Sequence, residues 1–275
     1  MSDRQKRPVI VRGGGDLATG VIATLVRVGF PVLVLEIETP SAIRRRVALC
    51  EAVYDGEATV EDIHCRLVRD MAEIEDCWQK GEAAMVIDPS GRWIDQLRPW
   101  AVVDAILAKK NLGTTIEMAP KTIALGPGFT AGKDARIVIE TMRGHHLGRL
   151  IRQGSALPNT GVPGLIGGQG KARVIHAPAA GIFRSLYQIG ETVEEGETIG
   201  IITDGDSRTE VTASLTGLLR GVIRDGFAVT KGLKIADIDP RAEEYKNCFT
   251  ISDKADHLGG SVLSALLQME EEDGF

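Results

Sequence analysis

A glycine-rich turn between a short apolar run and a helical pattern constrains the fold of this chain more than any other feature. Residues 9–11 form a β-branched apolar run, which is typical of a strand buried on both faces. They lead into Gly13-Gly14-Gly15-Asp16, after which apolar residues recur at helical spacing as far as Val28. A second apolar run over residues 31–35 ends at Glu36. This order of strand, turn, helix and strand predicts a βαβ unit and therefore a parallel sheet.

The turn also fits a dinucleotide-binding fingerprint. Gly13, Gly15 and Ala18 match the pattern G-x-G-x-x-A, and Glu36 follows where an acidic residue can bind a ribose hydroxyl. Glycines allow the backbone to approach a phosphate, and the N-terminus of the helix supplies unpaired N–H groups. Asp16 would repel a phosphate in this turn, and Arg12 would partly offset that repulsion. The alternative is a glycine turn that serves only the packing of helix on strand.

A second glycine-rich segment follows a later strand. Residues 122–125 predict a strand that ends in a loop over residues 126–132, and residues 101–111 predict a helix. Because ligands sit outside the carboxyl ends of strands in doubly wound sheets, the two loops could line one cleft. A plain surface turn is the alternative for this loop. The cofactor-binding candidates are therefore Arg12, Gly13, Gly14, Gly15, Asp16, Ala18, Thr19, Glu36, Gly126, Gly128, Thr130, Ala131 and Gly132.

From Val174 onward the pattern changes to short alternating segments with frequent glycines. Residues 181–202 align without a gap with residues 217–238, and both copies carry G-x-x-V-x-x-G-x-x-I. Two such copies resemble the barrel-sandwich hybrid of biotinyl and lipoyl carrier domains. The linker over residues 203–210 contains no lysine, so neither biotin nor lipoate is expected.

These patterns predict two domains of different class. We expect an α/β Rossmann-like, nucleotide- or cofactor-binding domain over residues 1–134. We expect an all-β, barrel-sandwich-hybrid-like domain with the two repeats and a C-terminal helix over residues 135–275. The length of 275 residues agrees with about two domains. A short acidic run over residues 270–273 is expected to be disordered.

Composition and cysteine spacing exclude several function classes. The net charge of −6 argues against a nucleic-acid partner. No apolar run reaches the roughly 18 residues of a membrane span, and no signal peptide is evident, so we expect a cytoplasmic protein. The four cysteines lack zinc-like spacing, and no metal site is expected. Cys248 precedes a polar stretch with Lys254, and Lys246 lies close by in the sequence. It is therefore the candidate catalytic thiol, with a structural thiol as the alternative.

Six motifs, spread over nearly the whole chain, are jointly specific. They are RGGGDLATG (12–20), EAVYDG (51–56), LGPGFTAG (125–132), IETMRGHHLGR (139–149), PNTGVPG (158–164) and CFTISDKADHLGG (248–260). Together they resemble the YqeB-like accessory proteins of the selenium-dependent molybdenum hydroxylase system. That family is distantly similar to the xanthine dehydrogenase accessory factors, which carry a Rossmann-type domain.

The resemblance implies a maturation protein that binds a phosphate-bearing, molybdopterin-type cofactor in the α/β cleft. Its partners would be a molybdenum hydroxylase apoprotein or other maturation factors, and a homo-oligomer is possible. Two alternatives stay open. One is an NAD(P)- or nucleotide-dependent enzyme that binds a dinucleotide through Glu36. The other is a non-catalytic interaction module, so the sequence leaves open whether any reaction is catalysed.

Overall fold

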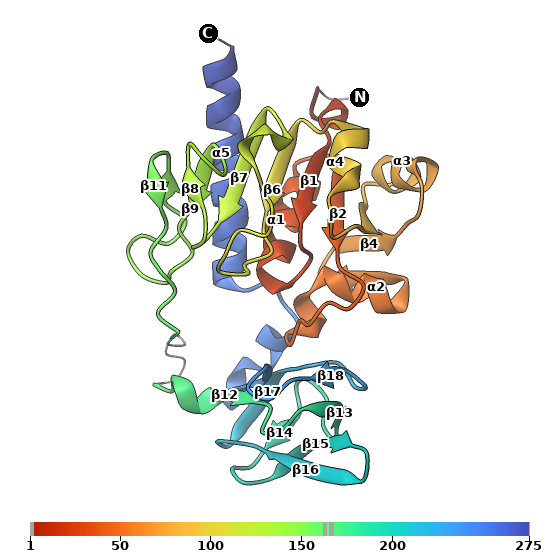
Figure 1. Ribbon diagram of the computed structural model, residues 1–275, viewed down its shortest axis with the longest axis vertical. Coiled ribbons are helices and arrows are strands. Elements are labelled where there is room, and N and C mark those ends of the chain that lie inside the picture. Colours follow the sequence, from red (N-terminus) through yellow and green to blue (C-terminus); the bar gives the residue numbers. More distant parts are fainter. Residues whose placement is uncertain (1–2, 162–163, 165–167, 275) are drawn as a thin grey trace. The chain divides into compact units, whose positions relative to one another are not determined.

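The computed structural model describes residues 3–161, 164 and 168–274 (Figure 1). The chain divides into two compact units, and neither is continuous in the sequence. Unit 1 comprises Met1–Pro40, Ala48–Thr160 and Ile251–Phe275, and unit 2 comprises Ser41–Val47 and Gly161–Thr250. Val162 and Pro163 of the PNTGVPG motif lie outside the described residues.

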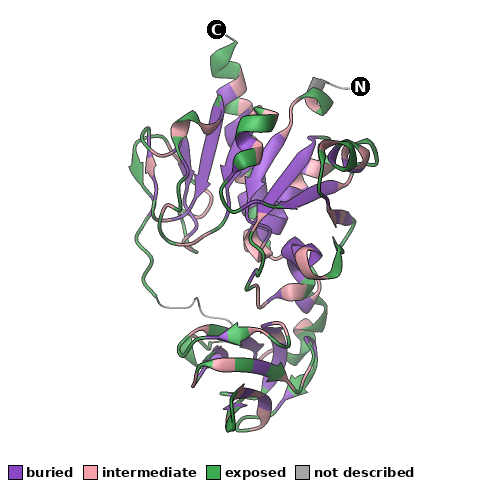
Figure 2. Ribbon diagram, turned by 45° about the vertical axis from the view of Figure 1, so that its right-hand side comes forward, coloured by how far each residue is buried: buried purple, intermediate pink, exposed green. Residues whose placement is uncertain are grey.

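Unit 1 is built on a nine-stranded mixed sheet with the strand order β10-β9-β7-β6-β1-β2-β5-β4-β3. Its strands are β1 (Val9–Arg12), β2 (Val32–Glu36), β3 (Glu57–Val60), β4 (Ile63–Leu67), β5 (Ala83–Ile87), β6 (Ala101–Asp104), β7 (Lys121–Leu125), β9 (Ile137–Ile139) and β10 (Leu150–Ile151). The seven strands from β4 to β9 in this order pair in parallel, whereas β3 and β10 pair antiparallel at the two edges. The central strands are buried (Figure 2), as their continuous apolar runs require.

The helices of unit 1 are α1 (Asp16–Arg27), α2 (Ala52–Asp55), α3 (Met71–Gln79), α4 (Arg92–Leu97) and α5 (Asp253–Asp273), with short 3-10 turns at η1 (Asp3–Lys6), η3 (Leu49–Glu51) and η4 (Ile116–Met118). The closest helix packing joins α1 to α5. A Cβ atom at Gly20 would lie 2.2 Å from the carbonyl oxygen of Ala255, and one at Gly259 would lie 2.2 Å from Oγ1 of Thr24. The two helices therefore meet backbone to backbone, and glycine is required on both sides of the contact.

Unit 2 contains two four-stranded antiparallel sheets, with the orders β12-β19-β17-β14 and β16-β15-β13-β18. Its strands are β12 (Val174–His176), β13 (Gly181–Ser185), β14 (Thr192–Val193), β15 (Thr198–Asp204), β16 (Ser207–Thr212), β17 (Gly217–Val222), β18 (Ala228–Val229) and β19 (Lys234–Asp239), with 3-10 turns at η2 (Arg45–Val47), η5 (Lys171–Arg173) and η6 (Ala242–Cys248). The sequence repeat is visible here, because β13, β14 and β15 begin 36 residues before β17, β18 and β19. Phe183 is fully buried in the core of the unit.

The predicted fold class is therefore corrected. We expected a Rossmann-like domain followed by a barrel-sandwich-hybrid-like domain, whereas the structure is one large mixed sheet with separate antiparallel sheets. The expected boundary at residue 134 also differs from the observed division. The strands β9 and β10 continue the large sheet, and α5 returns from the far end of the chain to pack on α1. A small pair of strands, β8 (Thr130–Ala131) and β11 (Gly154–Ser155), also belongs to unit 1.

Two local predictions are wrong as well. Residues 101–111 do not form a helix: residues 101–104 are β6, and a loop follows in which Leu107 and Lys109 have positive φ angles. A short apolar run cannot be assigned to helix or strand by periodicity alone, and here burial in a parallel sheet decides. The acidic run over residues 270–273 is the last turn of α5, where Glu270, Glu272 and Asp273 form ion pairs with Arg7, Arg152 and Lys121, respectively. No helix among the described residues has the length and apolar character of a membrane span.

Candidate ligand-binding site

The carboxyl edge of the large sheet contains the point at which the strand order reverses. β1 pairs with β2 on one side and with β6 on the other, all in parallel. Open parallel sheets bind ligands outside the carboxyl ends of the two strands at such a point. The glycine turn follows β1 directly, and its first residue is fixed to the neighbouring strand because Gly13 N donates to Leu35 O at 2.8 Å.

The three glycines of the turn have different surroundings. Gly13 has a φ of +93°, and a Cβ atom there would lie 3.1 Å from Cα of Ile106. A Cβ atom at Gly14 would lie 2.8 Å from Cε of Met85 and 3.1 Å from the backbone nitrogen of Cys50. Gly15 has an ordinary φ of −69°, and a Cβ atom there would meet no described atom within 4 Å. Gly13 and Gly14 are therefore required by the protein itself, whereas Gly15 borders open space.

Gly15 is also the N-cap residue of α1, and no side chain of the described residues caps this helix. Behind it, Ala18 is fully buried. Thr19 is buried too, and its Oγ1 donates to Gly15 O and accepts from Leu49 N, both at 3.0 Å. Thr19 therefore holds the turn in position from the protein side. The open space at Gly15 therefore lies at the N-terminus of α1.

Glu36 lies beside the turn, as the fingerprint predicts. Its Oε1 accepts a hydrogen bond from Gly14 N at 3.3 Å. Burial raises the pKa of the Glu36 carboxyl, and backbone hydrogen bonds from Ile37 and Gly14 lower it in part. The carboxyl group is thus positioned at the end of β2 next to the glycine turn.

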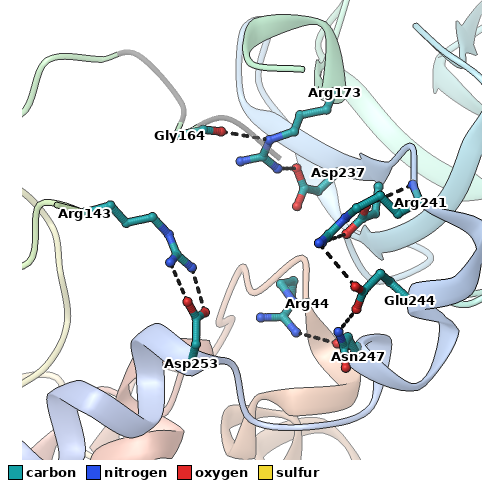
Figure 3. Close-up of polar contacts among 10 residues, drawn as sticks. Arg44, Arg143, Gly164, Arg173, Asp237, Arg241, Glu244, Asn247 and Asp253 are labelled. Carbon is teal, nitrogen blue, oxygen red and sulfur yellow. Dashed lines mark hydrogen bonds and ion pairs between the residues drawn. The ribbon is translucent and has the colours of Figure 1, made fainter. Parts of the chain in front are cut away.

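The negative charge of Asp16 is balanced by residues from two other motifs. Asp16 interacts electrostatically with Arg143 and Lys254. Arg143 also binds Asp253 through two hydrogen bonds of 2.7 and 2.9 Å (Figure 3). Burial lowers the pKa of Lys254, and the charge of Arg143 lowers it further. Both cations lie in motifs noted in the sequence, but neither was predicted to neighbour this turn, because each is more than 100 residues from it in the chain.

Arg12 was predicted to offset the charge of Asp16, but the structure places it beside Asp104. Its side chain is buried with that of Asp104, and Nη1 lies 3.6 Å from Oδ2 of Asp104. Thr114 completes the cluster, since its Oγ1 donates to Oδ2 of Asp104 at 2.5 Å and accepts from Arg12. Burial raises the pKa of Asp104, and the hydrogen bond from Thr114 opposes that rise. Arg12 therefore supports the ends of β1 and β6 from within, and its charge is shared with Asp104.

The second glycine loop approaches the same part of the sheet edge through the segment that follows β6. A Cβ atom at Gly126 would lie 2.7 Å from Oγ1 of Thr141, and one at Gly128 would lie 2.5 Å from Cα of Lys110. Because Ile106 contacts Gly13 and Lys110 contacts Gly128, the two loops border one segment. The remaining candidates of this loop, Thr130, Ala131 and Gly132, lie at or beside the small sheet of β8 and β11.

Cys248 in unit 2 does not have the accessible position that its polar sequence surroundings predict. It is 1% exposed, and burial raises the pKa of its thiol, although the charges of Arg220 and Arg44 lower it in part. The lysine proposed as its neighbour, Lys254, belongs to unit 1. A buried thiol with a raised pKa is the opposite of an activated nucleophile.

The arginines of unit 2 near Cys248 form their polar contacts within unit 2. Arg44 donates to the carbonyl oxygen of Asn247 at 3.0 Å, and Arg241 forms ion pairs with Asp239 at 2.8 Å and Glu244 at 3.3 Å (Figure 3). In the part of the chain that the structure describes, no three His, Cys, Asp or Glu side chains are grouped so as to hold a metal ion.

Comparison with known proteins gives one relative of high identity. An uncharacterized protein, YqeB from Escherichia coli K12, is 51% identical over 261 residues, which are 95% of this chain and 47% of that protein. The chain therefore spans about half the length of the curated relative that it matches. No family model matches the chain.

The solved structures found are distant. An aspartoacylase family protein from Mesorhizobium loti is 12% identical with a TM-score of 0.30, covering 86% of this chain and 85% of that one. A succinylglutamate desuccinylase from Silicibacter is 14% identical with a TM-score of 0.26, covering 84% of each. The apo ectoine utilization protein EutE from Ruegeria pomeroyi is 11% identical with a TM-score of 0.25, covering 84% and 86%. At these TM-scores the likeness carries no argument about fold or activity.

These findings overturn the predicted assignment to an accessory family of molybdenum hydroxylases. The relative is described as uncharacterized, and the solved structures named above are described as aspartoacylase, desuccinylase or ectoine utilization proteins. The predicted function as a maturation factor for selenium-dependent molybdenum hydroxylases is therefore wrong. Several glycines of the six motifs, such as Gly14, Gly126 and Gly128, lie where backbone and side chains pack closely.

Proposed function

We propose that unit 1 binds a dinucleotide at the carboxyl edge of its sheet, with its pyrophosphate in front of Gly15 and a ribose at Glu36. The observation that carries the proposal is the open space at Gly15. Its backbone conformation suits any residue, no described neighbour restricts a side chain, and Ser, Asp and Asn are favoured over Gly at an N-cap position. Glycine is favoured there if a phosphate approaches the backbone where a side chain would otherwise stand.

The surroundings of the turn support the same proposal. In dinucleotide-binding turns, the first glycine forms the tight turn, the second allows phosphate approach, and a third small residue permits close helix packing. Gly13, with its positive φ, Gly15, with its open space, and Ala18, with its complete burial, fit these three roles in turn. Arg143 and Lys254 balance the charge of Asp16, which would otherwise repel the pyrophosphate.

The second glycine loop, residues 126–132, forms a further wall of the proposed site. Gly126 and Gly128 border the segment that also contacts Gly13, so this segment joins the two loops at one sheet edge.

We extend the proposal to a cytoplasmic location. All four cysteines are free and buried, which is compatible with a reducing compartment.

Calorimetric titration of the full chain with NAD⁺, NADP⁺ and FAD tests the proposal. We expect the protein to bind at least one of the three, and Gly15→Val to weaken that binding by at least about tenfold, or about 1.4 kcal/mol. The folded state should tolerate Gly15→Val, because its φ is ordinary and its side chain meets open space. An unchanged circular dichroism spectrum and melting curve would establish that the variant is folded.

Gly260→Ala is the matched control. Gly260 lies within α5, and a Cβ atom there would also meet no described atom within 4 Å, so its replacement adds a side chain away from the turn. It should bind the dinucleotide as the unaltered protein does. The proposal fails if none of the three dinucleotides binds, or if folded Gly15→Val binds with the original affinity.

A further inference from the structure

The opposite, amino edge of the large sheet carries a groove of about 960 Å³. It is formed where β1, β6, β7 and β9 begin and where α4 ends, and its lining includes Pro8, Pro99, Pro120, Arg98 and Arg136. A smaller hollow of about 260 Å³ shares Ile116, Pro120 and Arg136 with it, so the two adjoin. The volume of the larger groove lies in the range of small-molecule sites, which is about 300–1,000 Å³.

Three prolines line the groove and make part of its wall rigid. Pro8, Pro99 and Pro120 each stand just before a strand, and proline has a fixed φ and no backbone N–H. Ile94 and Met118 add apolar surface to the same lining. A ligand therefore meets a preformed apolar wall here and gains its polar contacts from side chains at the rim.

Arg98 lines the groove and has a strained backbone conformation. It is the C-cap residue of α4, with φ 46° and ψ 65°, which is the left-handed conformation. Glycine or asparagine usually occupies this position, because a Cβ atom makes the conformation unfavourable by about 1 kcal/mol. An arginine at such a position points to a use of its side chain, since local strain of this kind is concentrated at functional sites.

The arginines of the groove differ in their ion pairing from the cations near the C-terminal end of α5. Arg7, Lys121 and Arg152 are each paired with an acidic residue of α5. In contrast, within the described part of the chain, the guanidinium groups of Arg98 and Arg136 form no hydrogen bond or ion pair, and Arg136 interacts with Asp273 of α5 only through its charge. Lys6 adds a third positive charge to the lining, against the two carboxylates of Asp95 and Glu117.

We propose that this groove binds a small organic anion, with an apolar body against the proline wall and a phosphate or carboxylate group bound by Arg98 and Arg136. Arginine favours both groups because its planar fork can donate two parallel hydrogen bonds to their oxygens. This site goes beyond the proposed dinucleotide site and is independent of it, because it lies at the other edge of the sheet and uses no residue of the glycine turn.

Fluorescence titration of the full chain with 1-anilinonaphthalene-8-sulfonate, an aromatic anion, tests the proposal. We expect Arg98→Gly and Arg136→Gln each to weaken binding of this probe by at least about fivefold, with Arg98→Lys between them and the unaltered protein. Arg98→Gly should also raise the melting temperature, because glycine relieves the strain at φ 46°. A purely structural role for Arg98 would change the melting temperature and leave binding of the probe unchanged.

Arg69→Gln is the control, because Arg69 is an exposed arginine that follows β4 at the carboxyl edge. Competition then identifies the anionic group. Displacement of the probe by phenyl phosphate at lower concentration than by benzoate supports a phosphate ligand, and the reverse order supports a carboxylate. The proposal is overturned if Arg98→Gly and Arg136→Gln bind the probe as Arg69→Gln does. It is also overturned if inorganic phosphate displaces the probe as well as phenyl phosphate does, since the apolar wall would then contribute nothing.

Discussion

The half-buried carboxyl group of Glu36 lies beside the proposed dinucleotide site, so its titration reports on that site. Burial raises its pKa above the ordinary value of 4.5, and the bonds from Ile37 and Gly14 only partly oppose that rise. A carboxyl whose pKa is higher in the folded state favours folding in its protonated form. Its contribution to stability is fully present below pH 4.5 and is lost as the pH rises through the raised value.

We therefore expect the free energy of unfolding of the unaltered protein to fall, relative to that of Glu36→Gln, as the pH rises above about 4.5. The glutamine variant keeps the shape and an acceptor for Gly14 N, but it has no charge to bury. Urea denaturation of both proteins between pH 4 and pH 8 measures the difference. Two curves that stay parallel over this range would show that the Glu36 carboxyl is not perturbed by folding.

The sequence indicates the residues of the glycine turn better than the residues that surround it in space. Gly13, Gly15, Ala18 and Glu36 could be predicted because their roles follow from local spacing. Asp16 is balanced by Arg143 and Lys254, and nothing local in the chain indicates that these residues meet it. Their approach depends on the docking of α5, which only the tertiary structure determines.

The contact of α1 with α5 is the packing that brings the distant motifs to the turn. It depends on Gly20, where an added Cβ atom would overlap the backbone of Ala255. Alanine in a helix is favoured over glycine by about 1 kcal/mol, but forced overlap in a packed contact costs about 1–3 kcal/mol and more when backbone is involved. We therefore expect Gly20→Ala to destabilise the protein by about 2 kcal/mol.

Gly260→Ala provides the comparison for this contact, because Gly260 lies in α5 with open space beside it. There only the helix preference acts, and we expect stabilisation of up to about 1 kcal/mol. Urea denaturation of the two variants measures both values. Equal stabilisation by both substitutions would contradict the close approach of α1 and α5.

Helices and strands could be predicted where the local sequence pattern agrees with the burial of the residues in the fold. β1, α1 and β2 follow from the apolar run, the turn and the helical spacing. The residues after β6 show the limit, since the segment from Ala105 to Asn111 has the composition of a helix but forms a loop with positive φ at Leu107 and Lys109. Contacts of this loop with Gly13 and Gly128 prevail over its intrinsic preference.

For the whole molecule, the sequence indicates the repeat but not the division of the chain. The spacing of 36 residues is apparent from the glycine pattern, and the structure forms corresponding strands at that spacing. That Ser41–Val47 belongs to unit 2, and Ile251–Phe275 to unit 1, could not be predicted, because only contacts between distant segments establish it. For the same reason a single boundary at residue 134 could not describe the chain.

A crystal structure of the full chain with whichever dinucleotide binds in the titration tests the proposed dinucleotide site most directly. We expect the pyrophosphate in front of Gly15, within hydrogen-bond distance of the first N–H groups of α1, and a ribose hydroxyl at the Glu36 carboxyl. A dinucleotide bound elsewhere in unit 1, with the space in front of Gly15 holding only water, would contradict it.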